Sequence, residues 1–278
     1  MQLRLSRAIL GVAFLVLASG AWADGWWLWH KPGTPTSITL PAEDVLKIGA
    51  QIWQNECAGT VEGLTSWNRG ENFASLGIGH FIWYPAGIEG PFEESWPKLV
   101  QFLRAKSIAL PIWILQERHC PWRNHEEFQR SRDGAQMREL RAFLARTVEA
   151  QTEFIVQRLR SALPKMVEAA GRDRTARRRL ESQFQALTGS GQGMYAMIDY
   201  VNFKGEGTKV EERYRGQGWG LAQVLLEMRG NPRGFAAPWE FSESAKRVLS
   251  YRVRNAPRDE SQWLQGWMNR CDTYKRPL

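Results

Sequence analysis

The spacing of apolar residues changes from that of a helix to that of a strand early in the chain. Val45, Ile48 and Ile52 recur every three or four positions and predict a helix that begins near Pro41. The segment Ser75–His80 instead alternates small or polar residues with apolar ones, which is typical of a strand whose glycines allow another group to come close. The sequence therefore predicts a helix, a polar loop and a glycine-bearing hairpin.

Most of the remaining chain has helical periodicity. The clearest apolar stripes lie in Gln136–Ala170, where Pro164 predicts a kink or a helix end. Shorter stripes occupy positions 96–103, 222–228, 242–252 and 261–269. We therefore expect a mainly helical α+β fold with one small β-hairpin near its start.

Glu56 continues the stripe of the first predicted helix, directly before the polar loop. Burial disfavours the charged form of a carboxylate, as a general acid requires. Perturbed carboxylates also occur in structural ion pairs. Two interpretations therefore stay open: a general acid that faces the hairpin across a gap, or a residue at the edge of the stripe that pairs with an arginine.

Glu56 followed by Ser75-Leu76-Gly77-Ile78-Gly79-His80 resembles the signature of phage-type lysozymes. In that family a catalytic glutamate ends a helix, and a Thr-Ile-Gly-x-Gly-His strand lies across the cleft. The resemblance implies a lysozyme-like fold with Glu56 as the general acid. It also implies that Ser75 helps to hold the attacking water or the substrate, and that His80 is structural.

The loop before the strand departs from the family pattern, because it lacks the expected aspartate. Its carboxylates are Glu62 and Glu71, and Asn68 lies near the expected place. If the protein is a hydrolase, we expect Glu71 to be the second catalytic carboxylate. Without one, the resemblance implies the single-glutamate chemistry of lytic transglycosylases, which are similar in fold. We expect Trp67, Asn68 and Gly77 to bind substrate on this side of the cleft.

A second polar break follows the helical segment that begins at Met194. Asp199, Asn202 and Glu206 place polar groups around the end of this segment. In lysozyme-like folds a later helix and loop form the far wall of the cleft. We therefore expect these three residues to bind substrate, together with Trp219, which lies between glycines. The alternative is an ordinary capped helix end, with Trp219 closing the fold.

The first residues have the pattern of a secretory signal peptide, which we place at 1–23. A basic head is followed by the apolar run Ile9–Leu17 and the cleavage pattern Ala21-Trp22-Ala23. The apolar run is short for a membrane span. We expect a periplasmic or secreted protein without membrane insertion after cleavage. Its single lysozyme-like domain would cover 24–278 and include an Arg-rich helical section at about 130–180.

Charge bears on the partner but does not select it. The chain has 37 basic and 29 acidic residues, a formal net charge of +8. An exported basic protein meets wall polymers, lipopolysaccharide or extracellular nucleic acid. The resemblance favours peptidoglycan or a related amino-sugar polymer, and no nucleic acid. The five arginines between Arg172 and Arg179 favour a solvated helix face over a wall-binding patch.

Cysteine and histidine give weaker signals. In an oxidising compartment two of Cys57, Cys120 and Cys271 can pair while one stays free, and either partner of Cys57 would hold the end of the first helix. His119 and His125 flank a Pro-Trp turn with Cys120, which is a poor zinc spacing. We expect no metal and no cofactor.

The sequence therefore predicts an exported enzyme that cleaves β-1,4 glycosidic bonds of peptidoglycan with Glu56 as general acid. The alternatives are a non-catalytic cell-wall or glycan-binding protein with the same fold, and an enzyme for a related polymer such as chitosan. The surroundings of Glu56 separate these cases. A carboxylate buried in a groove opposite Ser75 favours catalysis, and one held by an arginine away from any groove favours binding.

Overall fold

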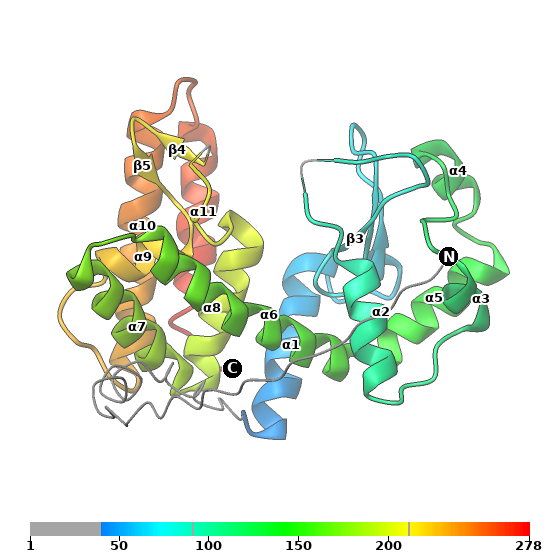
Figure 1. Ribbon diagram of the computed structural model, residues 1–278, viewed down its shortest axis with the longest axis horizontal. Helices are drawn as coiled ribbons and strands as arrows, with labels where there is room; N and C mark the ends of the chain where they lie inside the picture. Colours follow the sequence, from blue (N-terminus) through cyan, green and yellow to red (C-terminus); the bar gives the residue numbers. More distant parts are fainter. Residues whose placement is uncertain (1–39, 91, 211) are drawn as a thin grey trace, which may run out of the picture. The chain divides into compact units, whose positions relative to one another are not determined.

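Helices dominate the structure, and two short antiparallel sheets accompany them (Figure 1). The computed structural model describes residues 40–90, 92–210 and 212–278, so the predicted signal peptide lies outside the described residues. The prediction of a mainly helical α+β fold is confirmed. The helices are α1 (Ala42–Cys57), α2 (Trp96–Ala105), α3 (Ile112–Gln116), α4 (His125–Arg130), α5 (Ala135–Arg146), α6 (Val148–Ala169), α7 (Arg174–Thr188), α8 (Gly191–Lys204), α9 (Leu221–Glu227), α10 (Ala236–Asn255) and α11 (Ser261–Thr273), with the 3-10 turn η1 (Glu62–Leu64).

The first sheet contains the predicted hairpin and one further strand. Its strands β1 (Thr65–Ser66), β2 (Ala74–Leu76) and β3 (Phe81–Trp83) lie in sequence order and are antiparallel. The strand predicted over Ser75–His80 is wrong beyond Leu76, because the chain turns there. The turn begins at Gly77, where φ is +68°.

Gln151 of α6 holds this turn in place. Its side-chain oxygen accepts a hydrogen bond from the backbone N–H of Ile78 at 3.0 Å. A Cβ added to Gly77 would lie 2.3 Å from that oxygen. Gly77 therefore serves the close approach of the turn to α6, and its positive φ suits a residue without a side chain.

Helix α6 lies at the centre of the packing and contacts α1, α2, α5, α7 and α8. It approaches α1 closely because Gly49 faces Thr152, and a Cβ on Gly49 would lie 2.5 Å from the Thr152 hydroxyl. Pro164 does not end α6, although a proline removes one backbone hydrogen bond. Buried residues on both sides of Pro164, among them Leu159 and Met166, hold the helix together.

The later helices pack around α8 and α10. Helix α10 contacts α8, α9 and α11, and the hairpin of β4 (Arg213–Tyr214) and β5 (Gln217–Gly218) lies against α10. This hairpin precedes α9 and was not predicted, because its segment shows glycines and aromatic residues but no strand alternation. Among the described residues, no helix combines the length and the apolarity needed to span a membrane.

Candidate active site

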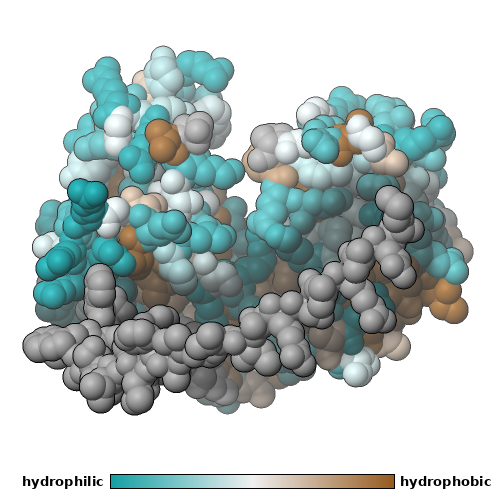
Figure 2. All heavy atoms as spheres, viewed as in Figure 1, coloured by the Kyte–Doolittle hydropathy of each residue, from teal (hydrophilic) through white to brown (hydrophobic). Residues whose placement is uncertain are grey.

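A groove of about 680 Å³ lies between the first sheet and the loop that follows α8. Figure 2 shows a hollow in the surface between the half of the molecule that contains the first sheet and the half that contains α8. The residues along its edges are mostly hydrophilic. The end of α1, the first sheet, α6, the loop after α8 and Trp219 contribute to its walls. The lining residues with side chains suited to chemistry or to sugar binding include Glu56, Glu71, Ser75, His80, Asn202, Lys204, Glu206 and Trp219.

Helix α1 delivers Glu56 to the groove one residue before the helix ends. The predicted stripe of Val45, Ile48 and Ile52 is buried and fixes the rotation of the helix. The helix ends because Ala58 takes a left-handed conformation, with φ of 52°, and its N–H bonds to the Trp53 carbonyl. The Glu56 side chain is 15% exposed, so it is largely shielded but reaches the groove.

Arg270 of α11 forms an ion pair with Glu56. The distance from Nη2 of Arg270 to Oε1 of Glu56 is 2.5 Å. The arginine pair of the second interpretation is therefore present, and the carboxylate also lines a groove, while its role as a general acid stays a prediction.

Asp199 of α8 holds Arg270 from behind. Its oxygens accept bonds from Nε and Nη2 of Arg270, both at 2.8 Å, and from the Tyr274 hydroxyl at 2.7 Å. Burial disfavours the charged guanidinium, but the bonds and charge of Asp199, together with the charge of Glu56, outweigh it and raise the pKa of Arg270. Arg270 is therefore a permanent cation beside Glu56.

His80 joins the turn after β2 to the end of α1. Its Nε2 lies 3.2 Å from the backbone oxygen of Glu56, and its Nδ1 lies 3.6 Å from Oε2 of the same residue. The φ of His80 is +46°, an uncommon value for a residue with a side chain. The contacts fit a residue that positions Glu56 against the first sheet.

Ser75 and Glu71 line the groove from the first sheet and its loop. Ser75 is the central residue of β2 and is buried. Glu71 accepts a bond from Nδ2 of Asn68 on Oε1, at 3.2 Å. Its Oε2 is buried and has no hydrogen-bond partner among the described residues. One oxygen of this groove-lining carboxylate is thus left unsatisfied beneath the surface.

Four predicted substrate-binding residues do not line the groove. Trp67 is buried against Phe128, and its Nε1–H donates to the Glu71 carbonyl at 2.8 Å. Asn68 bonds to Glu71, Gly77 forms the turn against α6, and Asp199 faces Arg270 behind the wall. These residues hold the loop, the turn and the arginine, and they do not belong to the groove lining.

The other three predicted substrate-binding residues line its far wall. Asn202 is exposed, and Glu206 pairs with Lys165 at 3.1 Å. Trp219 is only 8% exposed and packs on Tyr214, with 4.5 Å between the ring centroids. Trp219 therefore helps to close the fold and offers part of its ring to the groove.

Lys204 lines the groove but was not among the predicted site residues. Its Nζ lies 3.6 Å from the ring centroid of Trp267 and 4.1 Å from that of Phe203. The pKa of Lys204 is lowered to about 7, first by burial and then by the positive charges of Arg252 and Arg270, against the opposing effect of Glu260. Trp267 belongs to α11, which is distant in sequence from Lys204. Sequence patterns near Lys204 therefore could not reveal this contact.

The cysteines are all free and buried, so the disulfide allowed by the sequence does not form. Burial raises the pKa of Cys57, Cys120 and Cys271 to about 12 each. Within the described ranges, no group of three or more His, Cys, Asp or Glu side chains is placed to hold a metal ion.

Comparisons with protein-family models, curated proteins and solved structures find no significant match. The geometry of the groove is therefore the basis for a functional proposal.

Proposed function

We propose that the protein has a lysozyme-like fold and cleaves β-1,4 glycosidic bonds of peptidoglycan or a related amino-sugar polymer. The observation that carries this proposal is the position of Glu56, a shielded carboxylate in a groove that Ser75 and Glu71 also line. The groove volume of about 680 Å³ fits a ligand site, since such sites commonly measure about 300–1,000 Å³.

Glu56 is the proposed general acid. Arg270 holds Oε1, so Oε2 is the oxygen left to carry a proton to the leaving glycosidic oxygen. His80 lies on the side of Oε2 and keeps the carboxylate directed along the groove. Ser75 offers a hydroxyl that can hold water or a sugar group, as the resemblance to phage-type lysozymes implies.

Glu71 decides between two reactions. In a hydrolase with inversion it would activate water on the opposite face of the sugar, and such carboxylate pairs lie about 6.5–9.5 Å apart. Its position in the groove lining supports this role, since a general base must lie within reach of the water. In a lytic transglycosylase the substrate's own hydroxyl attacks instead, and Glu71 takes no part.

The first test is Glu56→Gln. Because a positioned general acid contributes about 10²-fold or more, we expect clearing of purified cell-wall sacculi to fall by at least that factor. The thermal midpoint should change little, because glutamine keeps the shape and Arg270 stays paired with Asp199. Glu93→Gln is the matched control, since Glu93 also lines the groove but pairs with Lys98 at the surface. Unchanged clearing by Glu56→Gln would remove Glu56 from the chemistry.

The second test is mass spectrometry of the products, with Glu71→Gln alongside. Reducing ends, together with slow turnover of the variant, would identify a hydrolase. Anhydro ends, with turnover of the variant retained, would identify a transglycosylase. Glu62→Gln is the control, because Glu62 belongs to the same loop region but is exposed and outside the groove.

The ion pair with Arg270 favours a second candidate, a glycan-binding protein that does not cleave. In that case Glu56 would contact the glycan as a carboxylate held in place by Arg270, and it would donate no proton. Wild-type protein would then sediment with sacculi but release no products. The Glu56→Gln variant would bind sacculi more weakly and would likewise release no products.

A further inference from the structure

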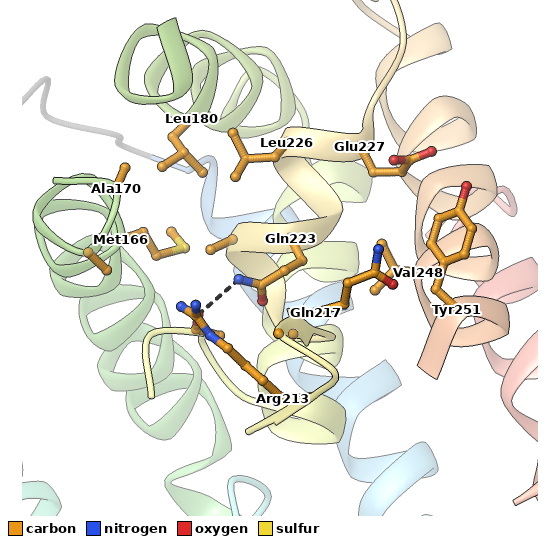
Figure 3. Close-up of a pocket in the computed structure, with 15 residues that line it drawn as sticks. Met166, Ala170, Leu180, Arg213, Gln217, Gln223, Leu226, Glu227, Val248 and Tyr251 are labelled. Atoms are coloured by element: carbon orange, nitrogen blue, oxygen red, sulfur yellow. Dashed lines mark hydrogen bonds between the residues drawn. The ribbon is translucent and has the colours of Figure 1, made fainter. Parts of the chain in front are cut away.

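A second cavity, called here the hairpin pocket, lies beside the β4–β5 hairpin and measures about 390 Å³ (Figure 3). It is distinct from the groove, although the same segment contributes to both. Glu212 and Trp219 line the groove, whereas Arg213 and Gly218 line the hairpin pocket. Residues adjacent in the chain at both ends of the hairpin therefore line different spaces.

Most of the pocket wall is apolar. Met166 from α6, Leu180 from α7 and Val248 from α10 are buried and face the cavity together with Leu226 of α9. In Figure 3, Leu180 and Leu226 lie toward one end, while Arg213 extends from β4 at the other end with its guanidinium group on the side of Met166. The cavity therefore has an apolar part and a cationic part.

The glutamines of the pocket are already engaged by the protein. Gln223 accepts a bond from the N–H of Gly220 at 2.9 Å and donates to the Gly207 carbonyl at 3.1 Å. Gln217 accepts a bond from the Asn255 side chain at 2.8 Å. These side chains thus shape the cavity rather than leave polar groups waiting for a ligand.

Arg213 differs from them. Its Nε is buried and has no hydrogen-bond partner among the described residues. Glu227, the carboxylate that lines the same cavity, is paired with Arg247 at 2.9 Å. A buried donor without an acceptor costs free energy, and a charged one costs more. An anion in the cavity would offset the charge of this guanidinium, which lines the cavity.

We propose that the hairpin pocket binds a small amphipathic anion, namely an aliphatic carboxylate. The carboxylate would bond to the Arg213 guanidinium, whose planar fork matches it. The aliphatic chain would lie against Met166, Leu180 and Leu226. The cavity is in the size range of small-molecule sites. This proposal does not depend on the function proposed for the groove.

The test is calorimetric titration of the full chain with octanoate, and with 1-octanol and acetate as partial ligands. We expect saturable binding of one octanoate, with 1-octanol and acetate each at least about tenfold weaker because each lacks one half of the ligand. Arg213→Gln should weaken octanoate about tenfold or more. Arg215→Gln is the matched control, because Arg215 is in the same hairpin but exposed and outside the pocket.

Ala170→Phe gives an independent check that leaves Arg213 in place. Ala170 lines the cavity from the end of α6, so a phenyl ring there should fill the space and abolish binding. Near-UV circular dichroism verifies that each variant is folded. Equal affinity for octanoate and 1-octanol, unchanged binding by folded Arg213→Gln, or no octanoate binding by the wild type would each overturn the proposal.

Discussion

At the scale of single residues, Lys204 is placed against aromatic rings instead of a carboxylate. Its folded-state pKa of about 7 lies below the ordinary value of 10.5. Between these two pH values the unfolded chain binds more protons at this residue than the folded one. Stability therefore rises with pH across that window, and the charged form of Lys204 costs stability below about pH 7.

Lys204→Met should therefore stabilise the protein at pH 6 and have a smaller effect at pH 9.5. Since the side chain is partly exposed, we expect a gain of only about 1–2 kcal/mol at pH 6. Urea unfolding at both pH values measures it. Lys209→Met is the control, because Lys209 lines the same groove but is exposed. A gain of equal size at both pH values would show that packing, not charge, is responsible.

The sequence pointed to Glu56 because its own helix carries the information, a stripe that leads to a carboxylate. It did not identify Arg270, which lies 214 positions away. The periodicity of α11 shows which residues share a face, but not which helix that face meets. For the same reason Lys204 and Trp267 could not be paired in advance, and Asp199 was expected in the groove rather than behind it.

At the scale of elements, the Asp199–Arg270 pair joins three helices. Asp199 belongs to α8, Arg270 belongs to α11, and α1 contributes Glu56 and also Asn55, whose Nδ2 donates to Asp199 at 3.1 Å. Asp199 is 1% exposed. The free energy of unfolding should therefore depend strongly on this carboxylate.

Asp199→Ala should lower the free energy of unfolding by about 3–5 kcal/mol, because it leaves the shielded Arg270 without its main partner. Denaturant titration gives the value. Asp272→Ala on α11 is the control, since Asp272 is 43% exposed and its pairs with lysines should contribute less than about 1 kcal/mol. Similar losses in the two variants would mean that the buried pair has no special role.

Element prediction succeeded where the pattern was long. The stripe of α6 indicated a helix across Gln136–Ala170, although the structure divides it into α5 and α6 at Thr147. The short strands were the failures. Two-residue strands such as β1 and β4 contain too few positions to show an alternation. Gly77 also ended β2 early, because the turn requires a positive φ that a strand pattern does not reveal.

At the scale of the whole molecule, the arginines of the section Arg172–Arg179 lie mainly in solvent. Arg174, Arg177 and Arg178 are exposed on α7, whereas Arg179 donates to the backbone carbonyl of Leu226 at 2.9 Å. This supports the predicted solvated face. The net charge of the chain, rather than one patch, should then control retention on an anionic wall.

Sedimentation with purified sacculi tests this at low salt and at about 0.15 M salt, where screening extends to about 8 Å. Arg177→Gln with Arg178→Gln should weaken retention only as much as Arg130→Gln with Arg132→Gln, a pair of exposed arginines elsewhere. As salt rises, the retention of both double variants should approach that of the wild type. A much larger loss for the α7 pair would instead identify a local wall-binding patch.

The turn of α6 at Pro164 touches both cavities. Lys165 lines the groove and its neighbour Met166 lines the hairpin pocket. A shift of this one turn would thus move a wall of both cavities. Proline supplies no N–H to the helix, so resistance to such bending is lowest there. A ligand in the groove or in the hairpin pocket would then change the ligand affinity of the other cavity through a local deformation of α6, with no movement of whole domains.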